Sequence, residues 1–472
     1  MAITKIASPA TFAPAYNPLK FIYDGTNKNI SGYRYIFDVY PAGSSTLLSR
    51  YKVFPQYSTG YGEIDISKLI SSMVSFDVPF LNTVSYNIPN SRYAYDVKIG
   101  EEYITTYAYT ASLVNNGGNV EITTTHTFVA GDQVTIAQAD GGVANPNLEG
   151  FFTVLSVVGT ASFTVNSLWA NVTNATINGD AFYSDNRKTT TLAVATSTSN
   201  QVFNGALSFQ DYTSYLPSSY LLSANTDYLL TNLPQTGFWA TTEQDLFVNF
   251  GNNSVTTGFI YFENSNGDIF KRSISIAQTI SGVPCGPDNT GSLTLVSGTA
   301  TLIKPTTTYY KFWYTNSGGT QHSVKYTVNI DTRCAIEDYS LLFMDRMGSF
   351  GSFAFQLRAY EKGTVAKQSF NKDVTGVVTA QIWGYLGSEY GQSVYSSTVA
   401  KTLELNTNWM TVEMAEYFEE LISSPVVYLK VGRFYQAVTV IDSSFEVEKQ
   451  RNKKLIKKTV TVAYANQNTV NI

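Results

Sequence analysis

The chain has 472 residues, of which 14% are charged and another 14% are aromatic. Soluble globular proteins usually carry about 25% charged residues. A net charge of −5 gives no broad positive field for nucleic acid, and two His residues make a His-based metal or acid–base site unfavourable. The abundance of Thr, Ser, Asn, Gly and Tyr favours strands and turns. The composition therefore predicts a mainly β protein with a structural or binding role.

The N-terminal residues lack the apolar core of a secretory signal, and no apolar stretch approaches the ~20 residues that cross a bilayer. We therefore expect a protein that is neither exported through a signal peptide nor inserted into a membrane. The two cysteines, Cys285 and Cys334, are far apart in the sequence. A reducing compartment favours two unpaired thiols, with a disulfide as the alternative. Without a supporting His cluster they predict no zinc site, and we expect no cofactor.

Residues 1–110 predict the first part of an N-terminal β domain. Strand-like runs such as GYRYIFDVY and LLSRYKVFP alternate with turn signals. One short helix is expected, with Asp65 as its cap. Its apolar face would consist of Ile66, Leu69, Ile70 and Met73.

The pattern of residues 111–186 differs from that of the preceding segment and predicts a small closed β-barrel inserted into that domain. Short strands follow one another closely, with turns at 131–132 and 140–142. A surface loop accepts such an insertion at little cost. Trp169, near its end, is a candidate for a peripheral contact. The expected inward positions are Val134, Ile136, Phe152, Val154, Phe163 and Val165.

Residues 187–335 predict the continuation of the β domain and a second β module. Hairpin turns are expected at 264–267, 297–298 and 318–319. His126 and His322 have no His or Cys neighbours in their strands, so a hydrogen-bonding role is favoured over catalysis.

Residues 336–472 predict a C-terminal β domain with an amphipathic helix at 410–423. Asn408 or Thr411 can cap this helix, and Pro425 follows its end. Its apolar stripe comprises Met414, Phe418, Leu421 and Ile422, and the carboxylates expected to lie off the stripe are Glu413, Glu416, Glu419 and Glu420. We interpret these carboxylates as a solvated face, or as a surface that meets a basic partner.

A basic stretch at 449–458 predicts an exposed, charge-protected hairpin. It contains six basic residues, among them Lys453, Lys454, Lys457 and Lys458. Our hypothesis is that these four lysines meet the acidic helix across a subunit boundary.

The common catalytic motifs are absent from the sequence, including the P-loop, G-x-S-x-G and H-E-x-x-H. The glycine cluster at 347–353 lacks the strand–loop–helix frame of a phosphate site, so a tight turn or bulge is expected there. Enzymatic activity is not predicted.

Several segments resemble virion structural proteins of tailed bacteriophages, especially those that infect Bacteroidota. These are PAYNPLKFIYDG, YGEIDISKLI, VFNGALSFQDY and YSLLFMDRMGSFGSFAFQLRAYEKG, followed by the helix and strands of NTNWMTVEMAEYFEELISSPVVYLKVGRFYQAVTVID. Asp345 stands where Asn is commoner in that group, and Met344 where Trp is commoner. Residues 119–184 separately resemble a small β-barrel of phage tail proteins that is related to the first catalytic-cysteine half-domain of ubiquitin-activating enzymes. The matching positions are His126, Phe128, Gly131, Asp132, Val134, Ile136, Leu148, Gly150, Phe152 and Val154.

The resemblance implies a virion component of the tail, baseplate or fibre type, with no catalytic residues to transfer. The leading hypothesis is a structural subunit that contacts copies of itself and other tail or fibre proteins. The main alternative is a receptor-binding protein that presents Tyr and Trp to a host surface glycan. A capsid or head–tail connector is a further alternative.

Overall fold

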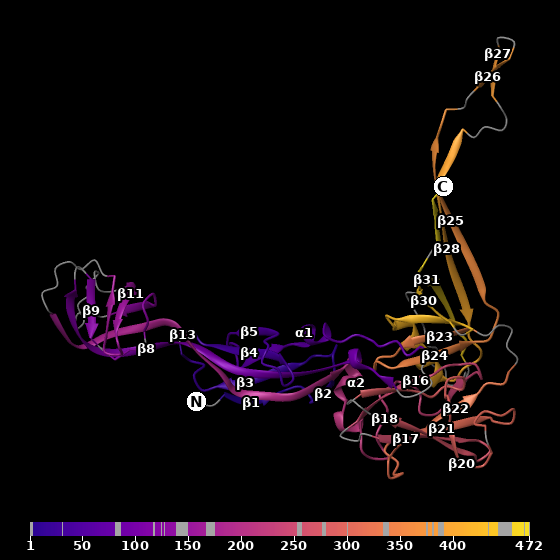
Figure 1. Cartoon of the computed structure of the whole chain (residues 1–472), viewed down its shortest axis with the longest axis horizontal. Coiled ribbons are helices and arrows are strands. Elements are labelled where there is room, and N and C mark those ends of the chain that lie inside the picture. Colours follow the sequence, from indigo (N-terminus) through magenta and orange to yellow (C-terminus); the bar gives the residue numbers. More distant parts are fainter. Residues whose placement is uncertain are drawn as a thin grey trace. The chain divides into compact units, whose positions relative to one another are not determined.

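A computed structural model describes most of the chain (Figure 1). The described residues are 3–30, 32–80, 86–116, 119–123, 125–126, 128–137, 150–166, 175–252, 257–275, 280–299, 301–333, 339–373, 376–379, 382–385, 391–432, 434–441, 456–466 and 468–471. The fold is mainly β, which confirms the prediction from composition. Within the described residues, no helix is both long and apolar enough to cross a membrane.

The chain divides into two compact units. Unit 1 comprises Met1–Thr11, Pro18–Lys68 and Ala94–Gln201, and unit 2 comprises Phe12–Asn17, Leu69–Tyr93 and Val202–Ile472. The predicted domain boundaries near residues 110, 186 and 335 stay predictions.

Unit 1 contains two sheets that surround an aromatic core. A three-stranded sheet has the order β1 (Ile3–Ala7), β3 (Lys20–Gly25), β6 (Gly62–Asp65). In the second sheet, β4 (Arg34–Pro41) lies between β5 (Ser49–Val53) and β8 (Arg92–Asn116). Burial alternates along β3, whereas β4 buries five consecutive residues and β5 buries none. Large fully buried side chains of these sheets are Phe21, Tyr23, Tyr35, Phe37 and Tyr95.

The segment predicted as an inserted barrel forms a circuit of paired strands. The pairings run in the order β13 (Ala175–Phe203), β10 (Gln133–Ala137), β11 (Gly150–Val158), β12 (Ser162–Val165), β9 (Asn119–Thr123), β8, and β8 also pairs with β13. The predicted inward residues Val134, Val154, Phe163 and Val165 are buried, while Phe152 is half-buried. His126 lies within this core, with Nε2 2.8 Å from the carbonyl of Ser162, as expected for a hydrogen-bonding histidine.

The predicted helix after Asp65 is shorter than expected. Helix α1 spans Ser67–Ser71, and the carboxylate of Asp65 accepts a hydrogen bond from the amide of Ser67 at 2.9 Å. Ile66 and Ile70 are buried as predicted, but Met73 is exposed. The hydroxyl of Ser72 donates to the carbonyl of Leu69, and such a local bond competes with continuation of the helix. Met73 therefore lies beyond the helix and not on its apolar face.

Unit 2 contains three sheets and a small hairpin. The four-stranded sheet has the order β14 (Leu221–Leu222), β16 (Phe247–Asn252), β19 (Ile280–Pro284), β7 (Tyr86–Asn87). The six-stranded sheet has the order β15 (Phe238–Ala240), β22 (Tyr326–Ile330), β21 (Tyr309–Asn316), β17 (Thr257–Asn264), β18 (Ile269–Ser275), β20 (Thr294–Ser297).

The largest sheet of unit 2 has the order β24 (Phe350–Phe355), β23 (Tyr339–Met344), β29 (Val427–Val431), β30 (Phe434–Val440), β31 (Thr459–Tyr464), β28 (Gln392–Asn406), β25 (Tyr360–Asn371). Strand β32 (Asn468–Asn471) pairs with β28, and β26 (Gly376–Thr379) pairs with β27 (Ile382–Tyr385). Strand β2 (Phe12–Pro14) and the short helices η1 (Pro89–Ser91), α2 (Phe209–Thr213) and η2 (Pro217–Ser219) complete the unit, together with α3 (Val412–Ser423). One buried apolar cluster joins residues of the six-stranded sheet, the largest sheet and α3.

Two of the three predicted hairpin turns are confirmed. Gly267 connects β17 to β18 and Gly319 connects β21 to β22, and both glycines have a φ of +83°. The prediction of a hairpin at 297–298 is wrong, because β20 ends at Ser297 and the residues from 301 to 308 form a loop.

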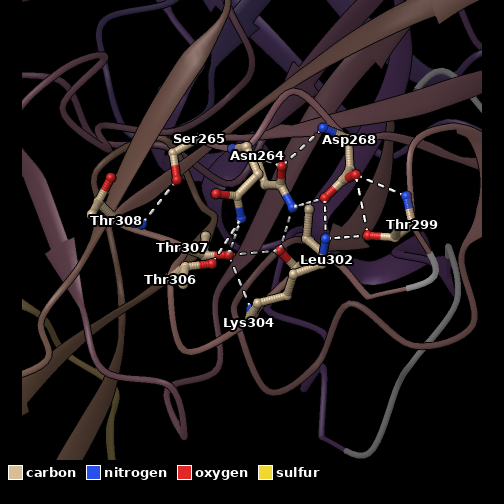
Figure 2. A network of polar contacts seen from close by, with 10 residues as sticks. Asn264, Ser265, Asp268, Thr299, Leu302, Lys304, Thr306, Thr307 and Thr308 are labelled. Carbon is tan, nitrogen blue, oxygen red and sulfur yellow. Dashed lines mark hydrogen bonds and ion pairs between the residues drawn. The ribbon is translucent and has the colours of Figure 1, made fainter.

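A side-chain network holds this loop and explains the error (Figure 2). The carboxylate of Asp268 accepts hydrogen bonds from the amide of Thr299 at 2.8 Å and from Asn264 Nδ2 at 2.9 Å, and it pairs with Lys304 Nζ at 2.5 Å. Asn264 Nδ2 also donates to the carbonyl of Leu302 at 3.0 Å. These contacts satisfy the polar groups of the loop without a strand ladder.

Cys285 is a free, buried thiol whose pKa is raised to about 12 by burial. Cys334 lies outside the described residues, so the expectation of two unpaired thiols stays a prediction.

Candidate functional site

Helix α3 and the surfaces beside it are the candidate functional site, because most of the residues predicted to lie at a subunit interface are on this helix or in the basic stretch near it. Thr411 is the cap: its hydroxyl oxygen accepts a hydrogen bond from the amide of Met414 at 3.3 Å. Asn408, the other cap candidate, instead donates to the side chain of Gln356 at 3.0 Å. The apolar residues Met414, Phe418 and Leu421 are buried as predicted.

The prediction that Glu420 lies off the buried face is wrong. Glu420 is only 8% exposed, and its carboxylate accepts a hydrogen bond from the amide of Arg346 at 3.0 Å. The guanidinium Nε of Arg346 lies 3.4 Å from the other carboxylate oxygen. Burial raises the pKa of Glu420, while Arg346 opposes this shift. A second face of α3, which also carries Tyr417, therefore packs against the turn at 345–349.

That turn is organised by Asp345, which is 3% exposed. One of its carboxylate oxygens accepts from the amides of Met347 and Ser349 at 3.0 and 2.9 Å. The other accepts from the Thr231 hydroxyl and the Asn232 amide, both at 2.9 Å. The glycine cluster is therefore a turn between β23 and β24, as expected, and Gly348 has a φ of +78°.

Asp345 and Glu420 are two buried carboxyl groups, a pair that general acid–base chemistry can use. Burial raises the pKa of Asp345 to about 7, with an added contribution from Glu420, while hydrogen bonds from Asn232 and Ser349 oppose the shift. Each carboxylate oxygen of Asp345, however, already accepts two hydrogen bonds from within the chain, and the carboxylate of Glu420 is paired with Arg346. This geometry makes the pair an anchor for the turn.

Two cavities flank the anchor. The first has a volume of about 480 Å³, and its lining includes Asp211, Tyr215, Tyr220, Glu413, Glu416 and Glu420. The second has a volume of about 350 Å³ and lies beside Asn204, Arg346 and Pro425. Glu413 and Glu416 are exposed as predicted, whereas Glu419 is half-buried. Chemically, the first cavity suits a cationic or polyhydroxylated group, because carboxylates and tyrosines line it.

The basic stretch is described only in part. Lys453 and Lys454 lie outside the described residues. The amide of Lys458 donates to the hydroxyl of Thr407 at 2.9 Å, and Lys457 Nζ lies 5.2 Å from the centre of the Trp409 ring. In this chain the stretch therefore borders the segment just before α3. Its pairing with the acidic helix of another subunit stays a prediction.

Two exposed tryptophans line a shallow hollow that the sequence did not single out. Trp239 is 40% exposed and Trp409 is 51% exposed. The guanidinium of Arg333 lies 5.9 Å from the Trp239 ring and pairs with Asp331. The planar side chains of Gln356 and Asn408 also border the hollow. Trp169, the tryptophan that the sequence did single out, lies outside the described residues.

The other unusual surface of unit 2 is β25. All of its residues are exposed, from Tyr360 to Asn371. It pairs with β28 along its whole length and is the last strand in its sheet, so its other edge is open among the described residues (Figure 1). This exposure was not predicted, although polar residues occupy both faces of the strand, with Glu361 and Lys367 on one face and Lys362 and Gln368 on the other.

No group of three or more His, Cys, Asp or Glu side chains in the described part of the chain could hold a metal ion. No known family model matches the sequence, and no curated protein matches it. Among solved structures, the phage phi92 endosialidase is similar at a TM-score of 0.19 and 10% identity, over 99% of this chain and 69% of that one. A similarity this low carries no argument about fold or activity.

Proposed function

We propose that this protein is a structural subunit of a tailed-phage virion, in the tail or baseplate, that works through contacts with copies of itself and with other tail proteins. The segments that resemble phage virion proteins support this assignment. So does a composition poor in charge and rich in aromatic residues, which suits proteins that bury broad surfaces in assemblies.

The observation that carries the proposal is the exposure of β25 at every residue. A long edge strand with open hydrogen-bonding groups is a template for pairing with another chain, and folded proteins usually cover or shorten such edges. An assembly subunit gains from keeping the edge open, because a neighbouring chain completes it.

Labelling of virions tests the assignment directly. Antibodies raised against the purified chain should label intact particles at one repeated position on the tail, and particles of an unrelated phage grown on the same host serve as the control. Detection of the protein only in the soluble lysate, never on purified particles, would contradict the proposal.

A second candidate function is recognition of a host surface glycan, and the hollow between Trp239 and Trp409 favours it. Aromatic faces stack on sugar rings, and planar amide and guanidinium groups supply hydrogen bonds at their rim. The purified chain should then compete with phage adsorption, and the double variant Trp239→Ala/Trp409→Ala should lose this competition. Phe434→Ala, which removes an exposed aromatic side chain elsewhere in unit 2, is the matched control. Equal competition by all three proteins would exclude this hollow as the glycan site.

A further inference from the structure

The open edge of β25 has a charge pattern that fits a second copy of itself. The strand carries Glu361, Lys362 and Lys367, and all three side chains are exposed. Glu361 pairs with Lys401 of β28 at 2.6 Å, with both side chains about half exposed. Lys362 pairs with Glu404 at 2.5 Å. These are surface contacts, which bind their side chains weakly.

The geometry of antiparallel pairing restricts how two copies of β25 can meet. Only alternate residues of a strand direct their amide and carbonyl groups to the open edge. Two residues that lie opposite each other in an antiparallel pair direct these groups to the same side, so in a symmetric contact their residue numbers are both odd or both even. The two-fold axis must therefore pass through a residue position and not between two positions. This leaves a small set of registers, each defined by the residue at its centre.

The charges distinguish these registers. With Thr364 at the centre, Glu361 of each copy lies opposite Lys367 of the other, and Lys362 lies opposite Ala366. Centres at Gly363, Val365 or Ala366 place no charged residue of the strand opposite another. A centre at Lys367 places this lysine opposite its own copy, and like charges directly opposite are destabilising. Edge lysines commonly oppose unwanted pairing, and here they leave one register favoured.

We propose that two copies of the chain associate through β25, antiparallel about a two-fold axis at Thr364, so that Glu361 and Lys367 form two reciprocal cross-strand ion pairs. The contact runs from Tyr360 to Gln368 on each copy and joins the two sheets along their open edges. It rests on the proposed function, because it specifies one contact by which copies assemble.

Charge exchange across this register tests the contact. The native mass of the full chain is measured by mass photometry and sedimentation velocity across a concentration series. The wild type should form particles that contain an even number of chains. Glu361→Lys and Lys367→Glu each convert both ion pairs into like-charge pairs, so each variant should weaken association about tenfold or more.

The double variant Glu361→Lys/Lys367→Glu restores two opposite-charge pairs and should recover association. Lys372→Glu is the matched control: it makes the same charge change as Lys367→Glu at an exposed lysine outside the paired segment, and it should associate like the wild type. Circular dichroism of each variant checks that the fold is retained.

A wild type that stays monomeric at every concentration, or that forms trimers, would overturn the contact. So would a Lys367→Glu variant that associates normally, or a double variant that is no better than the single ones. These outcomes are separate from the labelling of virions. If the chain is found on the tail but its association does not depend on these charges, only the β25 contact is refuted. If the chain associates as described but is absent from particles, only the proposed function is refuted.

Discussion

The two edge strands of the largest sheet differ sharply. At one edge, β24 buries five of its six residues, whereas at the other edge every residue of β25 is exposed. Neighbouring segments of the same chain cover the first edge. The hydroxyl of Ser349, just before β24, donates to the carbonyl of Phe247 at 2.9 Å, and Gln244 Nε2 donates to the Ser352 hydroxyl at 2.7 Å. One edge is therefore covered within the chain, whereas the other is open among the described residues, and we propose that another copy of the chain completes it.

The largest expected effect comes from the buried edge. Phe353 of β24 is 3% exposed, and its ring centre lies 5.3 Å from that of Phe418 in α3. Phe353→Ala should lower the free energy of unfolding by about 3–5 kcal/mol, because it removes a buried ring and leaves a cavity. Urea unfolding followed by tryptophan fluorescence measures the change. A loss below about 1 kcal/mol would mean that this edge is not part of the core.

The next effect concerns the turn that leads into β24. Asp345→Asn replaces a carboxylate that accepts four hydrogen bonds with an amide that presents an NH₂ group to some of the same donors. The free energy of unfolding should fall by about 1–3 kcal/mol. Asp373→Asn, the same substitution at an exposed residue of unit 2, is the control and should have a smaller effect. Equal losses in the two variants would contradict an anchoring role for Asp345.

The same carboxyl group predicts a pH dependence. Burial raises the pKa of Asp345 to about 7, above the value of about 3.9 expected in the unfolded chain. The folded state then binds the proton more tightly, so this contribution to stability is complete below about pH 4 and is lost as the pH rises through 7. The wild type should therefore melt at a lower temperature at pH 8 than at pH 5.5, and Asp345→Asn should narrow this difference. An unchanged difference in the variant would assign the pH dependence to other groups.

A smaller effect is expected at the start of α3. Thr411→Ala removes the hydroxyl that caps the helix and should lower the free energy of unfolding by about 1 kcal/mol. Thr411→Ser keeps the hydroxyl and should recover most of that loss. A larger loss of unfolding free energy in Asn408→Ala than in Thr411→Ala would contradict the assignment of Thr411 as the cap.

The smallest effect on stability is expected at the open edge. Phe370 of β25 is 50% exposed, so Phe370→Ala should change the free energy of unfolding by no more than about 0.5 kcal/mol, although it makes the same substitution as Phe353→Ala in the same sheet. The measurement is made on dilute protein, where copies do not associate. A loss comparable to that of Phe353→Ala would remove the contrast between the two edges.

The sequence was informative where local rules act. Capping and the apolar stripe predicted α3 to within two residues, and the glycines at 267 and 319 predicted two hairpins. The buried alternating residues of β10, β11 and β12 were also predicted, because a strand with one buried face has a period of two.

The failures arise where distant parts of the chain decide the outcome. Glu420 is buried because the turn at 345–349 supplies Arg346 to pair with it, and a helical pattern carries no information about that turn. The loop after Ser297 is held by Asp268, which precedes it by about thirty residues. The exposure of β25 was not predicted either, although its polar residues occupy both faces of the strand, which is the pattern of a strand that faces solvent on both sides.

Amide hydrogen exchange of β25 tests the central claim most directly. Peptides that cover Glu361–Gln368 should gain protection as the protein concentration rises, because the outward amides acquire partners only when a second copy binds, while peptides from β21 should exchange at the same rate throughout. Protection of β25 that does not depend on concentration, in protein that remains monomeric, would contradict the claim that another copy of the chain completes this edge.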